Sequence, residues 1–354
     1  MLFAGVDLGG TKIQTVLMRG RLVIGQSRVP TPDSGGASVV QAIQATLKAA
    51  ATSAGVKLSE IAAIGVGTPG SIDADRGVVS RASNIAGFEQ GFDLGPRVSR
   101  AAGGLPVLLE NDVRAAMLGE HRAGAGRPFR NLLGVFVGTG VGGGLVLEGK
   151  LRRGRGAAGE IGHTVVKDGG RECACGRLGC LEAYAGRGRM ELTARRLVDS
   201  GRKTVLFKLM EKKKRTRLTS GVIVSALEAG DQVAEDLVEE ATWALGIALA
   251  NAQNLLDLEA IMIGGGLGDR LGEPFIKRVA AHMQPHLFVP DDPPRMLATE
   301  LQDLSGAVGA AILATTLRST GKETLSAPRR PVAPRKTSAV APPRGSAASR
   351  SAHA

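Results

Sequence analysis

Aromatic side chains are scarce in this sequence, and the scarcity limits what the protein can bind by stacking. Only 3% of its 354 residues are Phe, Trp or Tyr, whereas 50 are glycine. Proteins that hold single-stranded nucleic acid without sequence preference stack successive bases on aromatic rings. The composition therefore disfavours such a platform and favours an α/β body rich in tight turns. With 43% hydrophobic residues, the chain is long enough for two domains with separate cores.

Long apolar runs are also missing from the sequence. No stretch approaches the roughly 20 consecutive apolar residues that a membrane-spanning helix needs. The first residues, MLFAGVDLGG, have neither the basic region nor the cleavage site of a secretory signal peptide. We therefore expect a cytoplasmic protein without a membrane partner, in a compartment where thiols stay reduced.

The whole chain has a net positive charge, but two segments account for all of it. The net charge is +12, and residues 202–217 carry +7 while residues 321–354 carry +6, which leaves −1 for the remainder. A DNA-binding domain would show a distributed basic footprint, so no specific nucleic acid partner is expected. We interpret 202–217 as a solvated helical insertion and 321–354 as a disordered basic tail. The alternative is that these two segments bind an anionic partner such as polyphosphate, nucleic acid or a membrane surface.

Cysteine is rare, and all of it lies in one short stretch with a histidine. Three cysteines cannot pair off completely as disulfides, whereas three thiolates and one imidazole make a closed tetrahedral zinc site. The candidate ligands are His163, Cys173, Cys175 and Cys180. The alternative is three small buried hydrophobic residues beside an ordinary core histidine. A closed site leaves no position for water, so zinc would shape the loop between Glu160 and Glu182 and perform no chemistry itself.

Two stretches combine a buried strand, a glycine turn and a second strand. Glycine has no side chain, so the amides of such turns can approach a phosphate closely. Lys12 can add positive charge, and Asp7 precedes the first turn, where it could orient Mg²⁺. Two such hairpins predict an internal duplication with a nucleotide held between the halves. The residues of the two turns are Gly9, Gly10, Thr11, Lys12, Gly138, Thr139 and Gly140.

A cluster of polar residues stands where a strand predicted at 105–109 meets a helix. Asp112 follows this strand at a point where helical amides point out of a sheet. Taken alone, an aspartate here is most often a plain helix N-cap, but the two phosphate turns favour a catalytic carboxylate. Gly265 and Gly266 follow another buried strand, where a base or ribose could lie against the backbone. Hydrophobic periodicity further predicts helices at 37–54, 94–102, 186–200, 221–256, 270–283 and 305–318, and strands at 2–8, 61–67, 132–137, 144–147, 259–263 and 296–299.

These pieces in this order resemble the ROK family of sugar kinases and sugar-responsive repressors, within the superfamily that shares the actin-like ATPase fold. The resemblance covers about residues 3–318 and rests on the motifs DLGGTK (7–12), GTPG (67–70), END (110–112), GTGVGGG (138–144), GEIGH (159–163) and CACGRLGCLE (173–182). It implies a duplicated, two-lobed α/β fold of the ribonuclease H-like type. The small lobe would be 1–118 completed by helix 305–318, and the large lobe, 119–304, would carry the zinc loop. Family members are usually dimeric.

The chain looks most like the bacterial glucokinases of this family, which implies ATP-dependent phosphorylation of a hexose, glucose first, at its 6-hydroxyl. By position, Asp112 would be the catalytic base. The residues holding the sugar would be Gly70, Asn84, Asn111, Asp112, Glu160, His163 and Glu182. The glycine turns would bind the phosphates of ATP, and Gly265 and Gly266 its adenosine. Such a reaction needs mainly alignment and charge neutralisation, which these residue types can supply.

Three positions depart from the family pattern, and other functions stay open. Arg114 stands where relatives commonly have a small or amide residue, RGRG at 153–156 looks slightly short, and the basic insertion 202–217 is unusual. A sugar-sensing repressor of the family would carry a helix-turn-helix domain ahead of the first hairpin, yet Asp7 follows Met1 by only six residues. The remaining alternatives are a non-catalytic sugar-binding protein, a kinase for another hexose or an N-acetylhexosamine, and a kinase that takes polyphosphate as its donor.

Overall fold

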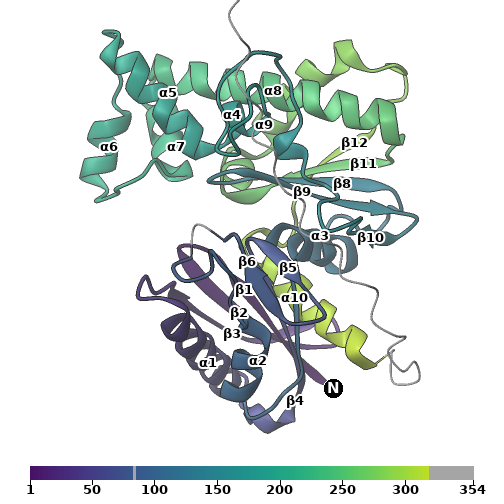
Figure 1. Cartoon of the computed structure of the whole chain (residues 1–354). Coiled ribbons are helices and arrows are strands. Elements are labelled where there is room, and N and C mark those ends of the chain that lie inside the picture. Colours follow the sequence, from purple (N-terminus) through teal and green to yellow (C-terminus); the bar gives the residue numbers. More distant parts are fainter. Residues whose placement is uncertain (83–84, 319–354) are drawn as a thin grey trace, which may run out of the picture. The chain divides into compact units, whose positions relative to one another are not determined.

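The computed structural model describes residues 1–82 and 85–318 (Figure 1). The predicted sugar contact Asn84 and the predicted tail 321–354 lie outside the described residues. None of the helices in the described part of the chain is both long and apolar enough to cross a membrane. Most of the predicted strands and helices are confirmed to within two residues at each end. The strand predicted at 144–147 begins at residue 141, the α-helix predicted at 305–318 ends at residue 315, and the other exceptions are named below.

The first sheet has five strands in the order β3-β2-β1-β4-β7. Strands β1, β2 and β3 form an antiparallel meander, and β4 and β7 add in parallel beside β1. The strands are β1 (Leu2–Leu8), β2 (Lys12–Arg19), β3 (Leu22–Pro30), β4 (Ile61–Thr68) and β7 (Val107–Asn111). Helix α1 (Gly36–Ser53) connects β3 to β4, and α2 (Leu94–Ala101) precedes β7. A small hairpin, β5 (Ser71–Asp73) and β6 (Val78–Ser80), follows β4.

The second sheet repeats this arrangement, with five strands in the order β10-β9-β8-β11-β12. Its first three strands again form an antiparallel meander, and the last two add in parallel beside β8. The strands are β8 (Leu132–Val137), β9 (Val141–Leu147), β10 (Lys150–Arg152), β11 (Ala260–Gly264) and β12 (Arg295–Ala298). The repeated strand order is what an internal duplication of the chain predicts.

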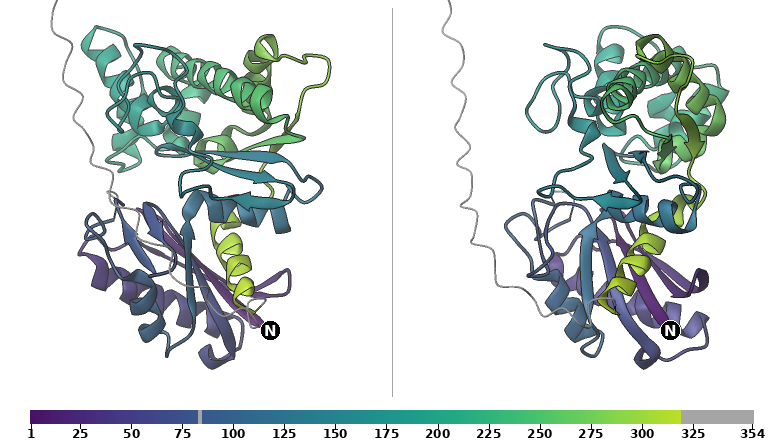
Figure 2. Two further views of the ribbon diagram at one scale, coloured as in Figure 1. Left: turned by 45° about the vertical axis from the view of Figure 1, so that its right-hand side comes forward. Right: turned by 90° about the vertical axis from the view of Figure 1, so that its right-hand side faces the viewer.

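Each sheet is followed by a helix, and these two helices lie against each other between the sheets (Figure 2). Helix α3 (Asp112–Ala123) follows β7, and α10 (Ser305–Thr315) follows β12. Met117 of α3 is fully buried in a cluster with Leu132, Val146 and Met262, so α3 packs on the second sheet. Helix α10 packs against β1, β2 and β4, on the face of the first sheet opposite to the one that α1 and α2 cover.

Small residues allow α10 to approach the first sheet closely, as the sequence predicted for 305–318. A Cβ atom added to Gly5 of β1 would lie 1.9 Å from the carbonyl oxygen of Ala307. One added to Gly65 of β4 would lie 1.8 Å from the carbonyl oxygen of Ala310. Real Cβ atoms do not tolerate such distances, so alanine at either position would push the helix off the sheet.

The region between β10 and β11 is helical, and here two sequence predictions were wrong. The predicted helix 221–256 is two helices, α7 (Ser220–Glu228) and α8 (Gln232–Leu256), because Gly230 turns with φ 71° and Asp231 caps α8. Only α6 (Leu206–Lys212) is helical within 202–217. The predicted helix 186–200 is confirmed as α5 (Arg187–Asp199), and the short α4 (Glu182–Ala185) precedes it.

Helix α9 (Gly265–Met283) begins five residues before its predicted start. The glycines at 265 and 266 therefore form its first turn, where the sequence predicted a loop after the strand. Gly272 interrupts the helix with φ 60° and ψ −145°, two residues ahead of Pro274. A proline cannot donate the helical hydrogen bond, and glycine supplies the left-handed residue that the kink needs.

A buried carboxylate on α3 fastens the chain ahead of α10. Glu120 is fully buried and accepts hydrogen bonds from the amides of Ala125, Glu300 and Leu301 and from the Ser305 hydroxyl. Replacing Glu120 by Ala should lower the free energy of unfolding by about 3 kcal/mol or more, because several buried donors lose their acceptor. Urea denaturation measures this loss. The exposed neighbour Glu300→Ala should change stability by no more than about 0.5 kcal/mol, and an equal loss in both variants would contradict the assignment.

Candidate functional site

A cavity of about 170 Å³ lies where the ends of several elements meet. Its walls come from the first sheet, from the start of α3, from the first turn of α9 and from the start of α10. The lining residues that matter below are Asp7, Lys12, Asp112, Gly265, Gly266, Asp269, Asp303, Ser305 and Gly306. The structure thus brings the predicted base, the predicted magnesium carboxylate and the predicted adenosine glycines to one place. Gly70, Asn111, Glu160, His163 and Glu182 do not line this cavity.

Asp7 is the last polar residue of β1 and faces the cavity. The pKa of its carboxyl group is raised to about 7, chiefly by burial and also by the nearby charge of Asp112, while the charge of Lys12 opposes the shift. The first turn of α10 leaves room for this group, because a Cβ atom on Gly306 would lie 2.8 Å from the carboxyl carbon of Asp7. Two carboxylates facing one small cavity repel each other, and a divalent cation between them would favour their charged forms.

The start of α3 argues against the alternative interpretation of Asp112 as a helix N-cap, because the N-cap of this helix is Asn111. The Asn111 Oδ1 atom accepts hydrogen bonds from the amides of Val113 and Arg114, at 3.1 and 3.2 Å. The side-chain NH₂ group of Asn111 is therefore the part that is left to donate to a ligand. Asp112 is half-buried at the cavity wall. Burial raises the pKa of its carboxyl group, and the charge of Glu160 adds to that rise.

The first glycine turn projects its tip into solvent. The amide of Gly9 donates to the carbonyl oxygen of Lys12 at 2.9 Å, which closes the turn, while Gly10 and Thr11 are exposed. The Lys12 ammonium lies 3.0 Å from a carboxylate oxygen of Asp303. Lys12 would have to share or leave this partner to neutralise a phosphate.

The second glycine turn carries a positive charge that the sequence did not predict. Arg187, the first residue of α5, donates to the Gly138 carbonyl at 3.1 Å and to the hydroxyls of Thr139 and Ser220 at 3.2 and 2.6 Å. Burial and the neighbouring charge of Arg270 lower the pKa of its guanidinium. Within the described residues, Arg187 has no carboxylate partner. A cation held against a glycine turn without a counter-ion is suited to binding an anion.

The four predicted metal ligands come together in the structure. Their ligand atoms lie within 4.8 Å of one another, with 3.7 Å between His163 Nδ1 and Cys173 Sγ and 3.7 Å between the sulfurs of Cys175 and Cys180. Tetrahedral zinc with Zn–S bonds of about 2.3 Å separates neighbouring ligand atoms by roughly 3.7 Å. The donor set and its spacing could therefore hold zinc.

This Cys/His loop is fixed against the second glycine hairpin. A Cβ atom on Gly162 would lie 1.9 Å from the carbonyl oxygen of Val141, so only glycine lets residues 159–163 lie on β9. The Glu182 Oε2 atom accepts the Val141 amide at 2.9 Å, and its Oε1 atom lies 3.7 Å from Cys173 Sγ. Glu160 is exposed. Of the other predicted sugar contacts, Gly70 turns away from β4 with φ 101°.

The comparisons with known proteins agree with this architecture. The family model described as "ROK family" matches residues 3–317, and the chain belongs to the ROK family. The predicted resemblance to this family is thereby confirmed, and so is the α/β fold. The chain is 34% identical over 317 residues to a glucokinase of Halalkalibacterium halodurans, covering 88% of this chain and 94% of that protein.

Two further relatives are a glucokinase of known structure and a kinase for a different sugar. The crystal structure of a ROK family glucokinase from Streptomyces griseus, in complex with glucose and AMPPNP, superposes with a TM-score of 0.75 at 33% identity, covering 89% of this chain and 100% of that one. An N-acetylmannosamine kinase of Salmonella typhi is 30% identical over 321 residues, covering 89% of this chain and 98% of that protein.

Proposed function

We propose that this protein is an ATP-dependent sugar kinase that phosphorylates a hexose at its 6-hydroxyl, with glucose as the substrate. The observation that carries the proposal is the position of Asp112. Its carboxylate faces a cavity shared with Asp7 and Lys12, at the start of a helix whose cap is made by a different residue. The similarity to glucokinases supports glucose as the sugar. The N-acetylmannosamine kinase relative makes an N-acetylhexosamine the second candidate.

Asp112 would accept the proton of the attacking sugar hydroxyl while the phosphoryl group is transferred. Its raised pKa suits this role, because a base is most effective when its pKa approaches the working pH. The amides of the two glycine turns, together with Lys12 and Arg187, would neutralise the charge on the phosphates. Asp7 would hold Mg²⁺, which supplies further charge neutralisation when bound. Gly265 and Gly266 would lie against the adenosine.

The sugar would be held by polar groups from three segments. The side-chain Oδ1 atom of Asn111 is already occupied, so its side-chain NH₂ group would donate a hydrogen bond to a sugar oxygen. Glu160, His163 and Glu182 would bind hydroxyls from the side of the Cys/His loop, with Gly70 and Asn84 completing the set. The Cys/His loop would hold zinc in a closed site that orders these contacts.

The wider organisation follows from the same proposal. The repeated five-stranded sheets with a nucleotide between them would be the two lobes of an actin-like ATPase fold. We propose the cytoplasm as its location, because thiolate ligands for zinc need a reducing compartment. A homodimer is the assembly that we expect from the family.

The proposed function is tested by measuring ADP release from the purified protein with ATP and a panel of sugars. Glucose should give the highest kcat/KM, and N-acetylmannosamine, N-acetylglucosamine, mannose and fructose should be poorer. A highest rate with an N-acetylhexosamine would replace glucose by the second candidate. ADP release that no sugar stimulates would refute the kinase, and calorimetric sugar binding in that case would favour a non-catalytic regulator.

Arg187 offers a separate test of the nucleotide side of the site. Arg187→Met removes the charge while keeping an unbranched stem, and it should raise the KM for ATP by about ten- to a hundredfold, the usual effect of losing a charged hydrogen-bond donor. The KM for sugar should change by less than about twofold in this picture. Steady-state kinetics with each substrate varied in turn measures both. Arg196→Met, on the exposed face of the same helix, is the matched control, and an unchanged KM for ATP in Arg187→Met would contradict the role.

A further inference from the structure

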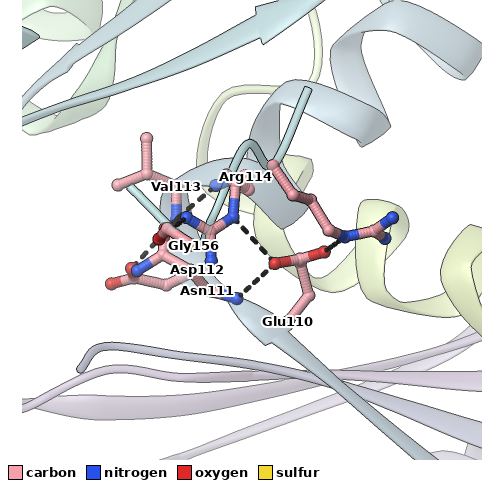
Figure 3. Close-up of polar contacts among 7 residues, drawn as sticks. Glu110, Asn111, Asp112, Val113, Arg114 and Gly156 are labelled. Carbon is pink, nitrogen blue, oxygen red and sulfur yellow. Dashed lines mark hydrogen bonds and ion pairs between the residues drawn. The ribbon is translucent and has the colours of Figure 1, made fainter. Parts of the chain in front are cut away.

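A buried arginine, Arg114, lies in the first turn of α3 (Figure 3). The Arg114 side chain is only 6% exposed, and its Nε atom donates to Glu110 Oε1 at 2.8 Å. The Glu110 side chain is 4% exposed, and its other carboxylate oxygen accepts from Arg153. The amide of Asn111 also donates to Glu110 Oε1, at 3.0 Å. One buried carboxylate therefore joins the end of β7, the start of α3 and the segment after β10.

Arg114 also makes a contact that reaches toward the sugar side of the site. Its Nη1 atom donates to the carbonyl oxygen of Gly156 at 3.0 Å (Figure 3). Gly156 lies four residues before Glu160, in the glycine-rich segment that leads into the Cys/His loop. Arg153 fastens the beginning of the same segment to Glu110. Arg114 thus connects the helix that carries Asp112 with the segment that carries Glu160.

Stability alone does not account for an arginine at this position. A buried ion pair contributes little net stability, because the desolvation of both charges offsets their attraction, and an apolar side chain of similar volume often stabilises a fold equally well. An apolar side chain could not donate to the Gly156 carbonyl. A lysine has the charge but a single terminal group, so it could reach Glu110 or Gly156 but could not hold both as a planar guanidinium does.

The charges around Asp112 point the same way. Burial raises the pKa of the Glu110 carboxyl group, but Arg114 and Arg153 together hold it below its usual range. Two guanidinium groups share one carboxylate here, which leaves a surplus positive charge behind Asp112. The charge of Arg114 lowers the pKa of Asp112 and so opposes the rise that burial and Glu160 cause. Arg114 thereby favours the deprotonated form that a general base needs.

We propose that Arg114 is a positioning residue that sets the distance between Glu160 and Asp112, and with it the affinity for sugar, through its paired contacts with Glu110 and Gly156. The proposal rests on the proposed function, in which the sugar lies between these two carboxylates. Arg114 touches neither substrate, but it connects the two segments that carry Asp112 and Glu160. Its effect should therefore appear on the affinity for sugar and not on the affinity for the nucleotide.

The experiment compares Arg114→Met, Arg114→Lys and the matched control Arg122→Met. Arg122 lies on the same helix, is exposed, and donates to the Gly149 carbonyl at 3.2 Å, in the turn between β9 and β10. Arg114→Met should raise the sugar KM, and the sugar Kd from calorimetry, by at least about tenfold, since misplacing a contacting group by about 1 Å costs on the order of 10²-fold. Arg114→Lys should recover part of the loss. The KM for ATP should stay within about twofold in all three variants.

The outcomes separate this inference from the function on which it rests. An unchanged sugar KM in folded Arg114→Met, or an equal rise in the KM for sugar and for ATP, would overturn the positioning role while wild-type turnover leaves the kinase intact. Should Arg114→Met fail to fold, Arg114→Lys decides the matter by the same ratio of the two KM values. A wild-type protein that neither phosphorylates nor binds any sugar would overturn both proposals together.

Discussion

Asp112→Asn is expected to retain sugar binding and to lose turnover by at least about a hundredfold, the lower range for a missing general base. Asparagine has nearly the same shape, and the helix cap is supplied by Asn111, so α3 should begin as before. The amide cannot accept the proton of the sugar hydroxyl. Calorimetry with sugar and a coupled ADP assay on the same preparation measure the two properties separately.

The pH dependence of the wild-type rate provides an independent reading of the same base. Asp112 acts when it is deprotonated, so kcat/KM should fall as the pH drops through the pKa of this group. Burial raises that pKa, so the fall should occur above the ordinary range of an aspartate. Asp269→Asn is the control, since this carboxylate lines the same cavity but is bound to the Thr299 hydroxyl, and it should lose far less activity. Intact binding with a nearly unchanged rate in Asp112→Asn would show that the base has been misassigned.

Disruption of the zinc site proposed for the Cys/His loop should weaken sugar binding far more than ATP binding. Cys175→Ser should raise the sugar Kd by about ten- to a hundredfold, because the loop that carries Glu160 and Glu182 would lose its fixed geometry. Its melting temperature should fall, because metal binding and folding of such loops are coupled. His163→Ala should have the larger effect, since it removes a ligand and a sugar contact at once.

Zinc content by elemental analysis, with separate titrations of sugar and nucleotide, measures these effects. Leu178→Ser is the matched control, because Leu178 is an exposed residue of the same loop whose side chain is not a ligand. It should keep both zinc and sugar affinity. A zinc-free protein with full sugar affinity would rule out the structural role and leave the gathering of the four side chains without an explanation.

The features that the sequence predicted correctly depend on patterns among residues that are close together in the sequence. A buried strand followed by glycines, as in residues 2–11, needs no information from elsewhere in the chain. The spacing of His163 and the cysteines likewise confines four ligands to one short loop. Helix 305–318 was recognisable because small apolar residues follow one another without interruption, and the close approach at Gly5 and Gly65 explains that composition.

The features that the sequence did not predict depend on contacts between distant residues. Arg187 lies 48 residues from its partner Thr139, and Arg114 lies 42 residues from Gly156. Strands β3 and β10 were not predicted; each lies at one edge of its sheet and carries few buried apolar residues. The division of 221–256 turned on a single turn at Gly230, since the apolar period continues on both sides.

The repeated strand order also allows the two sides of the cavity to be compared position by position. Asp112 and Ser305 are the first residues of α3 and α10, the helices that follow the last strand of each sheet, and both face the same space. In this chain the second side has a hydroxyl that is bound to Glu120. The two halves of the repeat therefore present different groups at matching positions, a carboxylate from α3 and a hydroxyl from α10, and in the proposed kinase only the α3 position would accept a proton.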